Sequence, residues 1–421
     1  MSLASVSRME AKLLLPTYER QPILFVRGRG VYLWDSLGKR YLDFLSGIGV
    51  NALGHSHPAV QAAIKRQAGR LIHVSNLFFH EYQAELARLL TEISGLDRVF
   101  FCNSGAEAWE GALKLARAFA QMSNRNGSKP KWRILAMENS FHGRTFGALA
   151  TTGQPKYRAP FVPLMPGVSF VKFNDLDDLQ RKFDSSVCAV CIETIQGEGG
   201  VCPVNAEFLE LASRLTKQSG ALLMLDEIQC GLGRTGRHFA YQHYGVLPDV
   251  VTVAKPLACG LPLGAILTTE RVASCMHPGL HGTTFGGGPL ACAVAIVFLR
   301  EEKKLLKHVR TLGEYFHAAL EALDRKHKSI QDVRGAGLMQ AVELDSPELA
   351  KAVAKQLLRE GIIINRTHET VLRFLPPYVV RKKHVDQLVK ALDAALRKNA
   401  ESRYKDKKTD PPGRKAIYAH A

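Results

Sequence analysis

The sequence predicts a layered α/β protein with a large domain on a mainly parallel sheet and a smaller α/β domain. Between residues 95 and 270, short apolar runs alternate with helical patterns, which is typical of strands joined by helices in a parallel sheet. A long helical pattern starts at Pro289, and shorter strand and helix patterns follow it to about residue 400. With 421 residues, 46% of them hydrophobic, the chain can form roughly two or three domains, which excludes disorder over most of its length.

The elements follow from periodicity and from turn residues. One helical stripe in 105–121 carries Ala108, Leu113, Ala116 and Phe119, so this segment should pack one face on the sheet. In the large domain we expect strands at 98–103, 133–138, 187–194, 220–228 and 249–254, and helices at 105–121 and 205–220. In the smaller domain we expect a helix at 289–327, strands within 331–344, 361–366 and 370–377, and helices at 346–361 and 384–399.

The charge balance is strongly basic but uneven. The chain carries 56 Lys plus Arg against 39 Asp plus Glu, a net charge of +17. Residues 381–421 hold twelve Lys or Arg and five Asp or Glu, a net of +7, and a second basic cluster lies at 125–133. These runs contain few aromatic residues and match no nucleic-acid motif. We therefore predict no nucleic-acid partner, and a basic nucleic-acid-binding protein stays a remote alternative.

Membrane, secretion and metal signals are weak. No run approaches the 18 apolar residues of a membrane span, and the first residues lack a signal-peptide core, so we predict a cytoplasmic protein with no membrane partner. Eight cysteines are too dilute for a disulfide scaffold, and Cys188 and Cys191 should point to opposite faces of one strand. His55 and His57 lack further ligands at metal spacing, so no metal site is predicted.

A glycine-rich segment raises one alternative. Gly231, Gly233 and Gly236 have the G-x-G-x-x-G spacing of a nicotinamide dehydrogenase. That motif needs a long helix after the turn and an acid at the end of the next strand. Here the following segment is short, and Asp249 precedes its strand instead of ending it. The context argues against dinucleotide binding.

Polar residues end two successive apolar runs. Asp226 and Glu227 close "LLMLDE", and Lys255 closes "VVTVAK". Ligand-binding groups gather at the carboxyl edge of a parallel sheet. An apolar strand end lowers the pKa of a lysine towards that of a nucleophilic amine. Lys255 taken alone also fits a surface lysine that caps a strand.

An acid and a lysine at strand ends are what pyridoxal phosphate needs, because its aldehyde binds an amine and its ring nitrogen binds a carboxylate. Its phosphate needs backbone N–H groups at a helix N-terminus, and Ser104, Gly105 and Ala106 form the turn that opens the helix at 105–121. Phe141 offers an aromatic ring for stacking. Arg144, in the same segment, offers a fork for a carboxylate.

At these residues the chain resembles a known family, over roughly residues 15–395. The class III pyridoxal phosphate aminotransferases, of the ornithine and acetylornithine type, have six similar motifs in the same order. The motifs are "NSGAEAWEGALKLAR", "SFHGRTFGAL", "IETIQGEGGV", "LDEIQCGLGRTG", "VVTVAKPLACGLPLGA" and "HGTTFGGGPLACAVA". The resemblance implies fold type I, with a mainly parallel seven-stranded sheet, and a homodimer with shared active sites. It implies a large domain at 51–305 and a small domain made of the two flanking segments, 1–50 and 306–400. We expect 401–421 to be a basic disordered tail.

The resemblance also implies a role for each matched cofactor residue. Lys255 would form the Schiff base and move the proton, and Asp226 would pair with the ring nitrogen. The remaining cofactor contacts would be Gln229 at the ring hydroxyl, Phe141 on the ring face, Gly105 and Ala106 at the phosphate, and Thr284 at the phosphate of the neighbouring subunit.

Four further matches concern substrates. Arg144 resembles the anchor of the α-carboxylate, and Thr283 resembles the position that touches an acylated substrate. Glu198 and Arg373 match a pair that serves two substrates: Glu198 would neutralise Arg373 when a neutral or cationic side chain is bound, and would release it for the second carboxylate of glutamate. This is a hypothesis about the site.

Two strings, "GIGVNALGHSHP" and "HVSNLFFHEYQ", look most like the acetylornithine members. They imply transfer of an amino group from N-acetylornithine to 2-oxoglutarate, as in arginine biosynthesis. Ornithine, 4-aminobutyrate and N-acylated lysine or diaminopimelate compounds remain alternative donors. The chain departs from the family at Ala106 and Trp109, where "SGTEANE" is usual, and at Pro256 and Cys259 after the lysine. We expect Ala106 to leave the backbone contacts of the phosphate turn intact, and Pro256 and Cys259 to alter loop mobility rather than chemistry.

Overall fold

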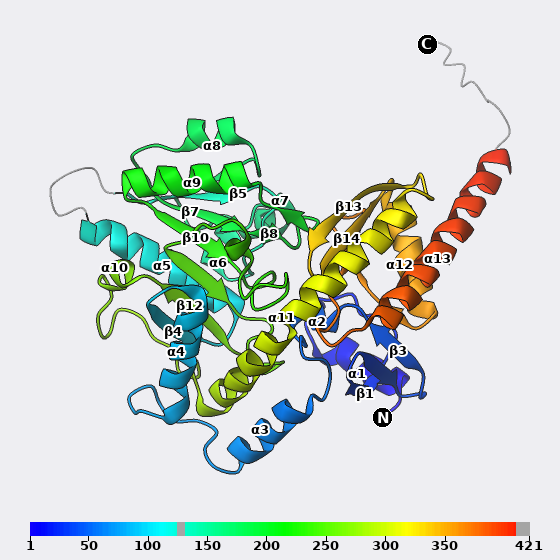
Figure 1. Ribbon diagram of the computed structural model, residues 1–421, viewed down its shortest axis with the longest axis horizontal. Helices are drawn as coiled ribbons and strands as arrows, with labels where there is room; N and C mark the ends of the chain where they lie inside the picture. Colours follow the sequence, from blue (N-terminus) through cyan, green and yellow to red (C-terminus); the bar gives the residue numbers. More distant parts are fainter. Residues whose placement is uncertain (124–130, 410–421) are drawn as a thin grey trace, which may run out of the picture.

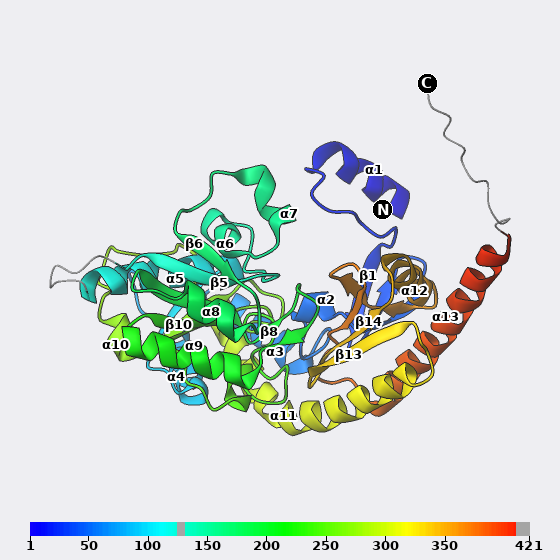
Figure 2. The same ribbon diagram turned by 90° about the horizontal axis from the view of Figure 1, so that it is seen from above.

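The computed structural model describes residues 1–123 and 131–409. Two lobes lie side by side, and the long helix α11 (Pro289–Asp324) runs from one to the other (Figure 1). The larger lobe contains the middle of the chain. The smaller lobe contains both ends of the described chain (Figures 1 and 2). The basic cluster expected at 125–133 lies mostly outside the described residues.

The larger lobe is built on a seven-stranded sheet. Every neighbouring pair is parallel except those made by β12, which runs antiparallel to both β4 and β11. The predicted mainly parallel α/β fold is thus confirmed. The strands, in spatial order, are β4 (Arg98–Cys102), β12 (Gly264–Thr268), β11 (Val250–Val253), β10 (Leu222–Asp226), β7 (Val187–Glu193), β5 (Arg133–Met137) and β6 (Val168–Val171).

Helices cover both faces of this sheet because strand side chains alternate in direction. Helix α5 (Gly105–Ser123) packs its apolar stripe against one face, where Met224 and Val250 belong to the same buried cluster. Helix α9 (Ala206–Ser219) packs against the other face, where Leu223 and Val251 are buried. Neighbouring residues of one strand therefore serve two separate cores, which explains why these strands are apolar without interruption.

The smaller lobe contains two four-stranded sheets. The segment 331–344, expected as strand, forms two antiparallel strands that turn at Gly337, whose φ is +54°. Strand β3 pairs in parallel with β15, so both chain ends share one sheet. The first sheet has the order β1 (Phe25–Arg29), β2 (Tyr32–Asp35), β3 (Arg40–Asp43), β15 (Ile362–Ile363), and the second β13 (Ile330–Ala336), β14 (Met339–Leu344), β17 (Val371–Phe374), β16 (Asn365–Thr367).

Helices α12 (Pro347–Arg359) and α13 (Lys382–Thr409) complete the smaller lobe. Ser346 caps α12 by accepting a hydrogen bond from the Leu349 N–H at 3.3 Å, as its position before Pro347 predicts. Helix α13 extends into the segment 401–421, which was expected to be a disordered tail. Residues 410–421 lie outside the described residues.

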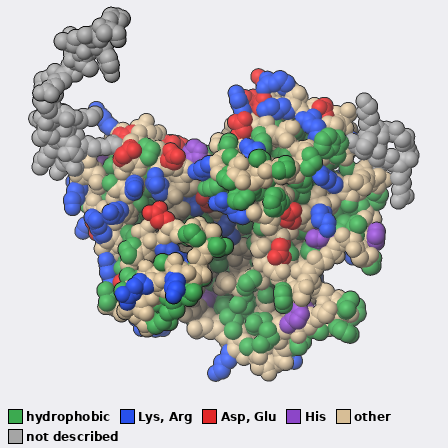
Figure 3. Space-filling view, turned by 180° about the vertical axis from the view of Figure 1, so that it is seen from behind, with side chains coloured by type: hydrophobic (Ala, Val, Ile, Leu, Met, Phe, Trp, Pro, Cys, Tyr) green, Lys and Arg blue, Asp and Glu red, His purple; other side chains and the backbone are tan. Residues whose placement is uncertain are grey.

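The surface carries no continuous basic stripe on the face shown in Figure 3, where Lys and Arg side chains are interspersed with acidic ones around a central hollow. Among the described residues, no helix is long and apolar enough to cross a membrane. Cys188 and Cys191 are free and buried in β7, as predicted. Their expected placement on opposite faces of the strand is wrong: both belong to the same buried cluster, because the pairing of β7 with β5 shifts register next to Cys188.

Candidate active site

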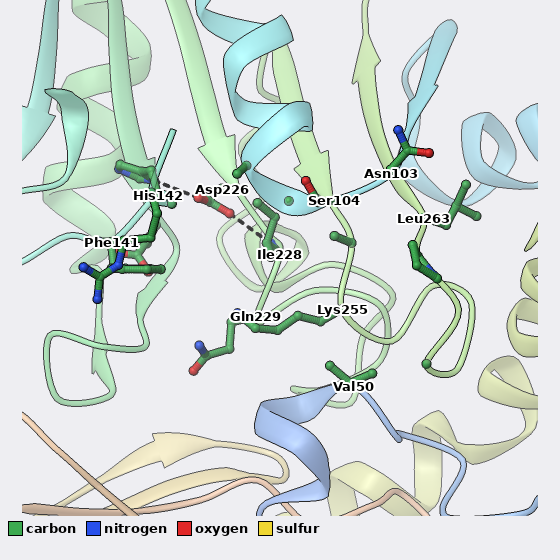
Figure 4. Close-up of a pocket in the computed structure, with 18 of the residues that line it drawn as sticks. Val50, Asn103, Ser104, Phe141, His142, Asp226, Ile228, Gln229, Lys255 and Leu263 are labelled. Atoms are coloured by element: carbon green, nitrogen blue, oxygen red, sulfur yellow. Dashed lines mark hydrogen bonds and ion pairs between the residues drawn. The ribbon is translucent and has the colours of Figure 1, made fainter. Parts of the chain in front are cut away.

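A cavity of about 450 Å³ opens at the carboxyl edge of the large sheet. Lys255 follows β11, Asp226 ends β10, and both line the cavity. The two strands are parallel neighbours in the sheet, with Asp226 opposite Thr252. Strand order therefore brings together an amine and an acid that are separated along the sequence (Figure 4).

Asp226 is held rigidly. It is 4% exposed, and its Oδ1 accepts a hydrogen bond from the backbone N–H of Ile228 at 3.0 Å. Its Oδ2 lies 2.7 Å from Nδ1 of His142. Figure 4 shows both interactions. Two N–H groups thus orient the carboxylate, which remains at the wall of the cavity.

Lys255 has the electrostatic environment of a reactive amine. Its pKa is lowered, chiefly because burial disfavours the ammonium form. The positive charge of Arg373 lowers the pKa further, while the negative charges of Glu198 and Asp226 act in the opposite direction. A lysine in this state can act as a nucleophile or as a proton carrier.

The turn before α5 forms a tight cradle. Ser104, Gly105 and Ala106 line the cavity at the N-terminus of this 19-residue helix, where backbone N–H groups attract anions. Gly105 packs closely against the site, since a Cβ there would lie 2.9 Å from the Ile228 side chain and would force it to shift. Together with Lys255, this donor set fits pyridoxal phosphate: an amine, a fixed carboxylate and an anion cradle around one cavity.

Phe141 and Arg144 line the same cavity from the loop that follows β5. The Arg144 guanidinium lies over the ring of Tyr157, 4.0 Å from its centroid, and 5.5 Å from that of Phe141. The Tyr157 ring in turn packs edge-on against Phe141, with centroids 5.8 Å apart. Stacking on an aromatic face leaves the donors at the guanidinium edge free to bind a carboxylate.

Glu198 and Arg373 form an ion pair beside the cavity, with Oε1 and Nη1 2.6 Å apart. Arg373 Nη1 also donates to Oε1 of Gln229, which lines the cavity, at 2.9 Å. Neither Glu198 nor Arg373 is among the residues that line the cavity itself, and the Arg373 side chain is fully buried. The expected pair is therefore formed, and it contacts the site through Gln229.

Comparison with known proteins decides the family. The model of the family described as aminotransferase class III matches residues 15–396. The chain is 47% identical to an acetylornithine aminotransferase of Caldanaerobacter subterraneus, with 92% of this chain and 98% of that protein covered. It is 46% identical to one of Methanocaldococcus jannaschii, covering 91% and 96%. The chain belongs to the class III aminotransferases.

Solved structures agree with this assignment. The ornithine aminotransferase of Toxoplasma gondii superposes with a TM-score of 0.91 at 33% identity, over 96% of both chains. A second structure of that enzyme is described as having partial occupancy of PLP at its active site. The acetylornithine aminotransferase of Elizabethkingia anophelis gives a TM-score of 0.82 at 32% identity, over 94% of this chain and all of that one.

In this class III aminotransferase, Thr283 and Thr284 lie outside the cavity. Thr283 Oγ1 accepts a hydrogen bond from Asn103 Nδ2 at 3.2 Å, and Asn103 lines the cavity. Thr284 and the neighbouring Phe285 are exposed. Within one chain the cavity therefore holds Gly105, Ala106, Phe141, Arg144, Asp226, Gln229 and Lys255, and it lacks Thr283, Thr284, Glu198 and Arg373.

Two buried residues of the aminotransferase site were not predicted from the sequence, His142 and Glu193, and both line the cavity. Glu193 ends β7, and its carboxyl group accepts hydrogen bonds from the backbone N–H groups of Phe141 at 3.0 Å and Gly197 at 3.3 Å. An acid that closes an apolar strand is the same signal that marked Asp226. Among the described residues, no group of three or more His, Cys, Asp or Glu could hold a metal ion.

Proposed function

We propose that this aminotransferase uses pyridoxal phosphate to move the δ-amino group of N-acetylornithine to 2-oxoglutarate, giving N-acetylglutamate semialdehyde and glutamate, a step of arginine biosynthesis. The observation that carries the proposal is the convergence of Lys255 and Asp226 on one cavity from adjacent parallel strands. The names of relatives at 43–47% identity support the choice of amino donor.

Bound pyridoxal phosphate supplies an electron-withdrawing ring that stores the electron pair left when the substrate carbon loses its proton. Lys255 Nζ would take that proton and return it, because its lowered pKa makes the neutral amine available. Asp226 would hold the ring nitrogen in its protonated form. Phe141 would stack on the ring, and the N–H groups of Gly105 and Ala106 would bind the phosphate.

Substrates are held by groups around the cavity. We assign the α-carboxylate to Arg144, whose guanidinium is braced by Tyr157. The acyl group is assigned to Thr283. When N-acetylornithine is bound, Glu198 neutralises Arg373, as it does in the structure. When 2-oxoglutarate or glutamate is bound, Arg373 takes up the second carboxylate.

A homodimer with shared active sites is also proposed. Asn76 Nδ2 donates to the backbone oxygens of Thr283 and Gly286 at 3.2 and 3.1 Å, and these bonds join two loops that carry exposed apolar side chains. A large exposed apolar surface marks a site of association. Association of two subunits through this surface would bring Thr284 to the phosphate of the neighbouring subunit. The apolar side chains are Leu71, Ile72, Leu77, Phe78, Phe79 and Phe285.

The domain division into 51–305 and a small domain of 1–50 with 306–400 is proposed on the same basis. The pairing of β3 with β15 supports it, since a strand from each chain end contributes to one sheet. We propose a cytoplasmic location, as expected for an enzyme that uses a soluble keto acid.

A donor panel tests the proposal. The purified protein should be yellow, and with 2-oxoglutarate it should turn over N-acetylornithine with a higher kcat/KM than ornithine, 4-aminobutyrate or N-acyl-lysine. Lys255→Ala is the matched inactive control. A colourless protein that gains no visible absorbance from added pyridoxal phosphate would overturn the cofactor assignment. Faster turnover of another donor would overturn only the choice of substrate.

A further inference from the structure

Trp109 stands where the family motif has a small polar residue, and its indole ring lies on the imidazole ring of His142. The ring centroids are 4.0 Å apart and the planes are inclined by only 8°. Trp109 is fully buried, and its Nε1 donates to Oγ1 of Thr151 at 2.8 Å. The indole is therefore fixed in its own plane, and it presents one face to the imidazole.

Among the residues that the structure describes, the imidazole of His142 has a single hydrogen-bond partner. Its Nδ1 lies 2.7 Å from Asp226 Oδ2, while its Nε2 is buried and has no hydrogen-bond partner among the described residues. An imidazolium donates through both nitrogens, and a buried donor without an acceptor is costly. The geometry therefore favours the neutral ring with its proton on Nδ1, donated to Asp226.

This charge state matters for Asp226. A neutral His142 orients the carboxylate through a hydrogen bond and leaves its negative charge intact. An imidazolium would neutralise that charge. A smaller side chain at position 109 would leave space beside the imidazole that water can enter, and water would supply the acceptor that Nε2 lacks.

We infer that Trp109 is a positioning residue for Asp226 and acts through His142. Its indole fixes the plane of the imidazole and excludes water from it, so that His142 stays neutral and Asp226 keeps a full negative charge towards the cavity. The assignment of the ring nitrogen of pyridoxal phosphate as the partner of Asp226 rests on the proposed function. The protonation state of His142 does not depend on that assignment.

Nitrogen NMR of the full-length protein, labelled with ¹⁵N-histidine, measures that state directly. At neutral pH, with and without cofactor, His142 should show a protonated Nδ1 and an unprotonated Nε2, assigned by loss of the signals in His142→Asn. A doubly protonated His142 in the wild-type protein would overturn the inference, whether or not any variant folds. A neutral His142 in a chain that takes up no pyridoxal phosphate would contradict the proposed function instead.

Variants then test the indole itself. Trp109→Leu should move the Nε2 signal towards its protonated position and weaken pyridoxal phosphate binding about tenfold, as measured by equilibrium dialysis. Trp109→Phe keeps an aromatic face and should remain within about twofold of wild type. Trp132→Phe is the matched control, because Trp132 is 46% exposed and precedes β5, whereas His142 follows it. A folded Trp109→Leu protein with unchanged signals and affinity, or a Trp109→Phe protein as impaired as Trp109→Leu, would overturn the role of the stacked ring.

Discussion

Arg373 Nη1 lies 2.6 Å from Glu198 Oε1, and the guanidinium is fully buried. Its Nε donates to Asn365 Oδ1 at 3.1 Å, while its Nη2 is buried with no partner among the described residues. Burial raises the pKa of Glu198, but the charge and hydrogen bond of Arg373 outweigh it, so this pKa is lowered. Glu198 therefore stays ionised and competes directly with a substrate carboxylate for Arg373.

Replacing Arg373 should separate the two half-reactions. With Arg373→Ala, kcat/KM for glutamate should fall about 100-fold, since a lost charge-assisted hydrogen bond is worth about 1.5–3 kcal/mol. The reaction with N-acetylornithine has no second carboxylate to anchor and should fall less than about tenfold. Single-turnover absorbance changes measure each half-reaction. Arg366→Ala, an exposed arginine on β16, is the control, and equal losses on both substrates would contradict the switch.

Lys255 predicts a pH dependence. Its lowered pKa means that more of the lysine is neutral amine at each pH below the ordinary value of about 10.4. Only the amine attacks an aldehyde, so the rate of covalent cofactor attachment should rise with pH and level off below that value. Stopped-flow absorbance after mixing cofactor-free enzyme with pyridoxal phosphate measures this rate. A midpoint at or above that of free lysine would contradict the environment described for Lys255.

The same lysine gives a chemical control. Lys255→Ala should retain no cofactor after borohydride reduction and denaturation, because the bond to Nζ cannot form. Its transamination rate should fall by at least about 10³-fold, the size of a lost proton-transfer group. Retention of a reduced, covalently bound cofactor in this variant would assign the attachment to another residue.

Truncation tests the basic C-terminal segment. Deleting 401–421 keeps Val385, Leu392 and Leu396, the side chains by which α13 is anchored in the core of the described residues. We expect kcat/KM to be unchanged and the stability to remain within about 0.5 kcal/mol of the full-length protein. A chain that ends at residue 390 loses Leu392 and Leu396 and should be destabilised by at least about 2–5 kcal/mol. A large loss of activity in the shorter deletion alone would give the segment a function.

The site residues that the sequence predicts lie at the ends of strands. Asp226 and Lys255 could be predicted because each closes an apolar run, and parallel strands place such ends on one edge. The order of the strands could not be predicted, and neither could the reversed direction of β12 between β4 and β11. An apolar strand that is buried on both faces has the same pattern in either direction.

The residues that contact Asp226 and Glu193 could not be predicted either, because they are far away in the sequence. His142 is 84 residues from Asp226, and Phe141 is 52 residues from Glu193. These contacts exist because β7 lies between β10 and β5 in the sheet, an order that no local pattern encodes. Trp109 departs from the family motif in the sequence, but its stacking on His142 depends on how α5 packs on the sheet.

Glu193 links two loops of the site, and its pKa is raised well above the ordinary value, chiefly by burial and then by the charge of Asp226. Glu193→Ala would leave the N–H groups of Phe141 and Gly197 without their acceptor. We expect this variant to lose about 1–3 kcal/mol of stability and to bind pyridoxal phosphate more weakly, since Phe141 is no longer held. Glu193→Gln keeps one acceptor oxygen and should be affected less on both measures.

The raised pKa of Glu193 predicts how the stability of the protein changes with pH. The unfolded chain releases the Glu193 proton near the ordinary value of about 4.3, whereas the folded chain retains it to higher pH. Between the pKa of Glu193 in the unfolded chain and its higher pKa in the folded chain, the folded state binds more protons. The contribution of Glu193 to the stability of the wild-type protein therefore falls as pH rises. Glutamine does not titrate, and the stability of Glu193→Gln relative to wild type should therefore increase with pH over this window. Chemical denaturation at a series of pH values measures the difference, and a constant difference would show that the folded protein ionises Glu193 as readily as the unfolded chain does.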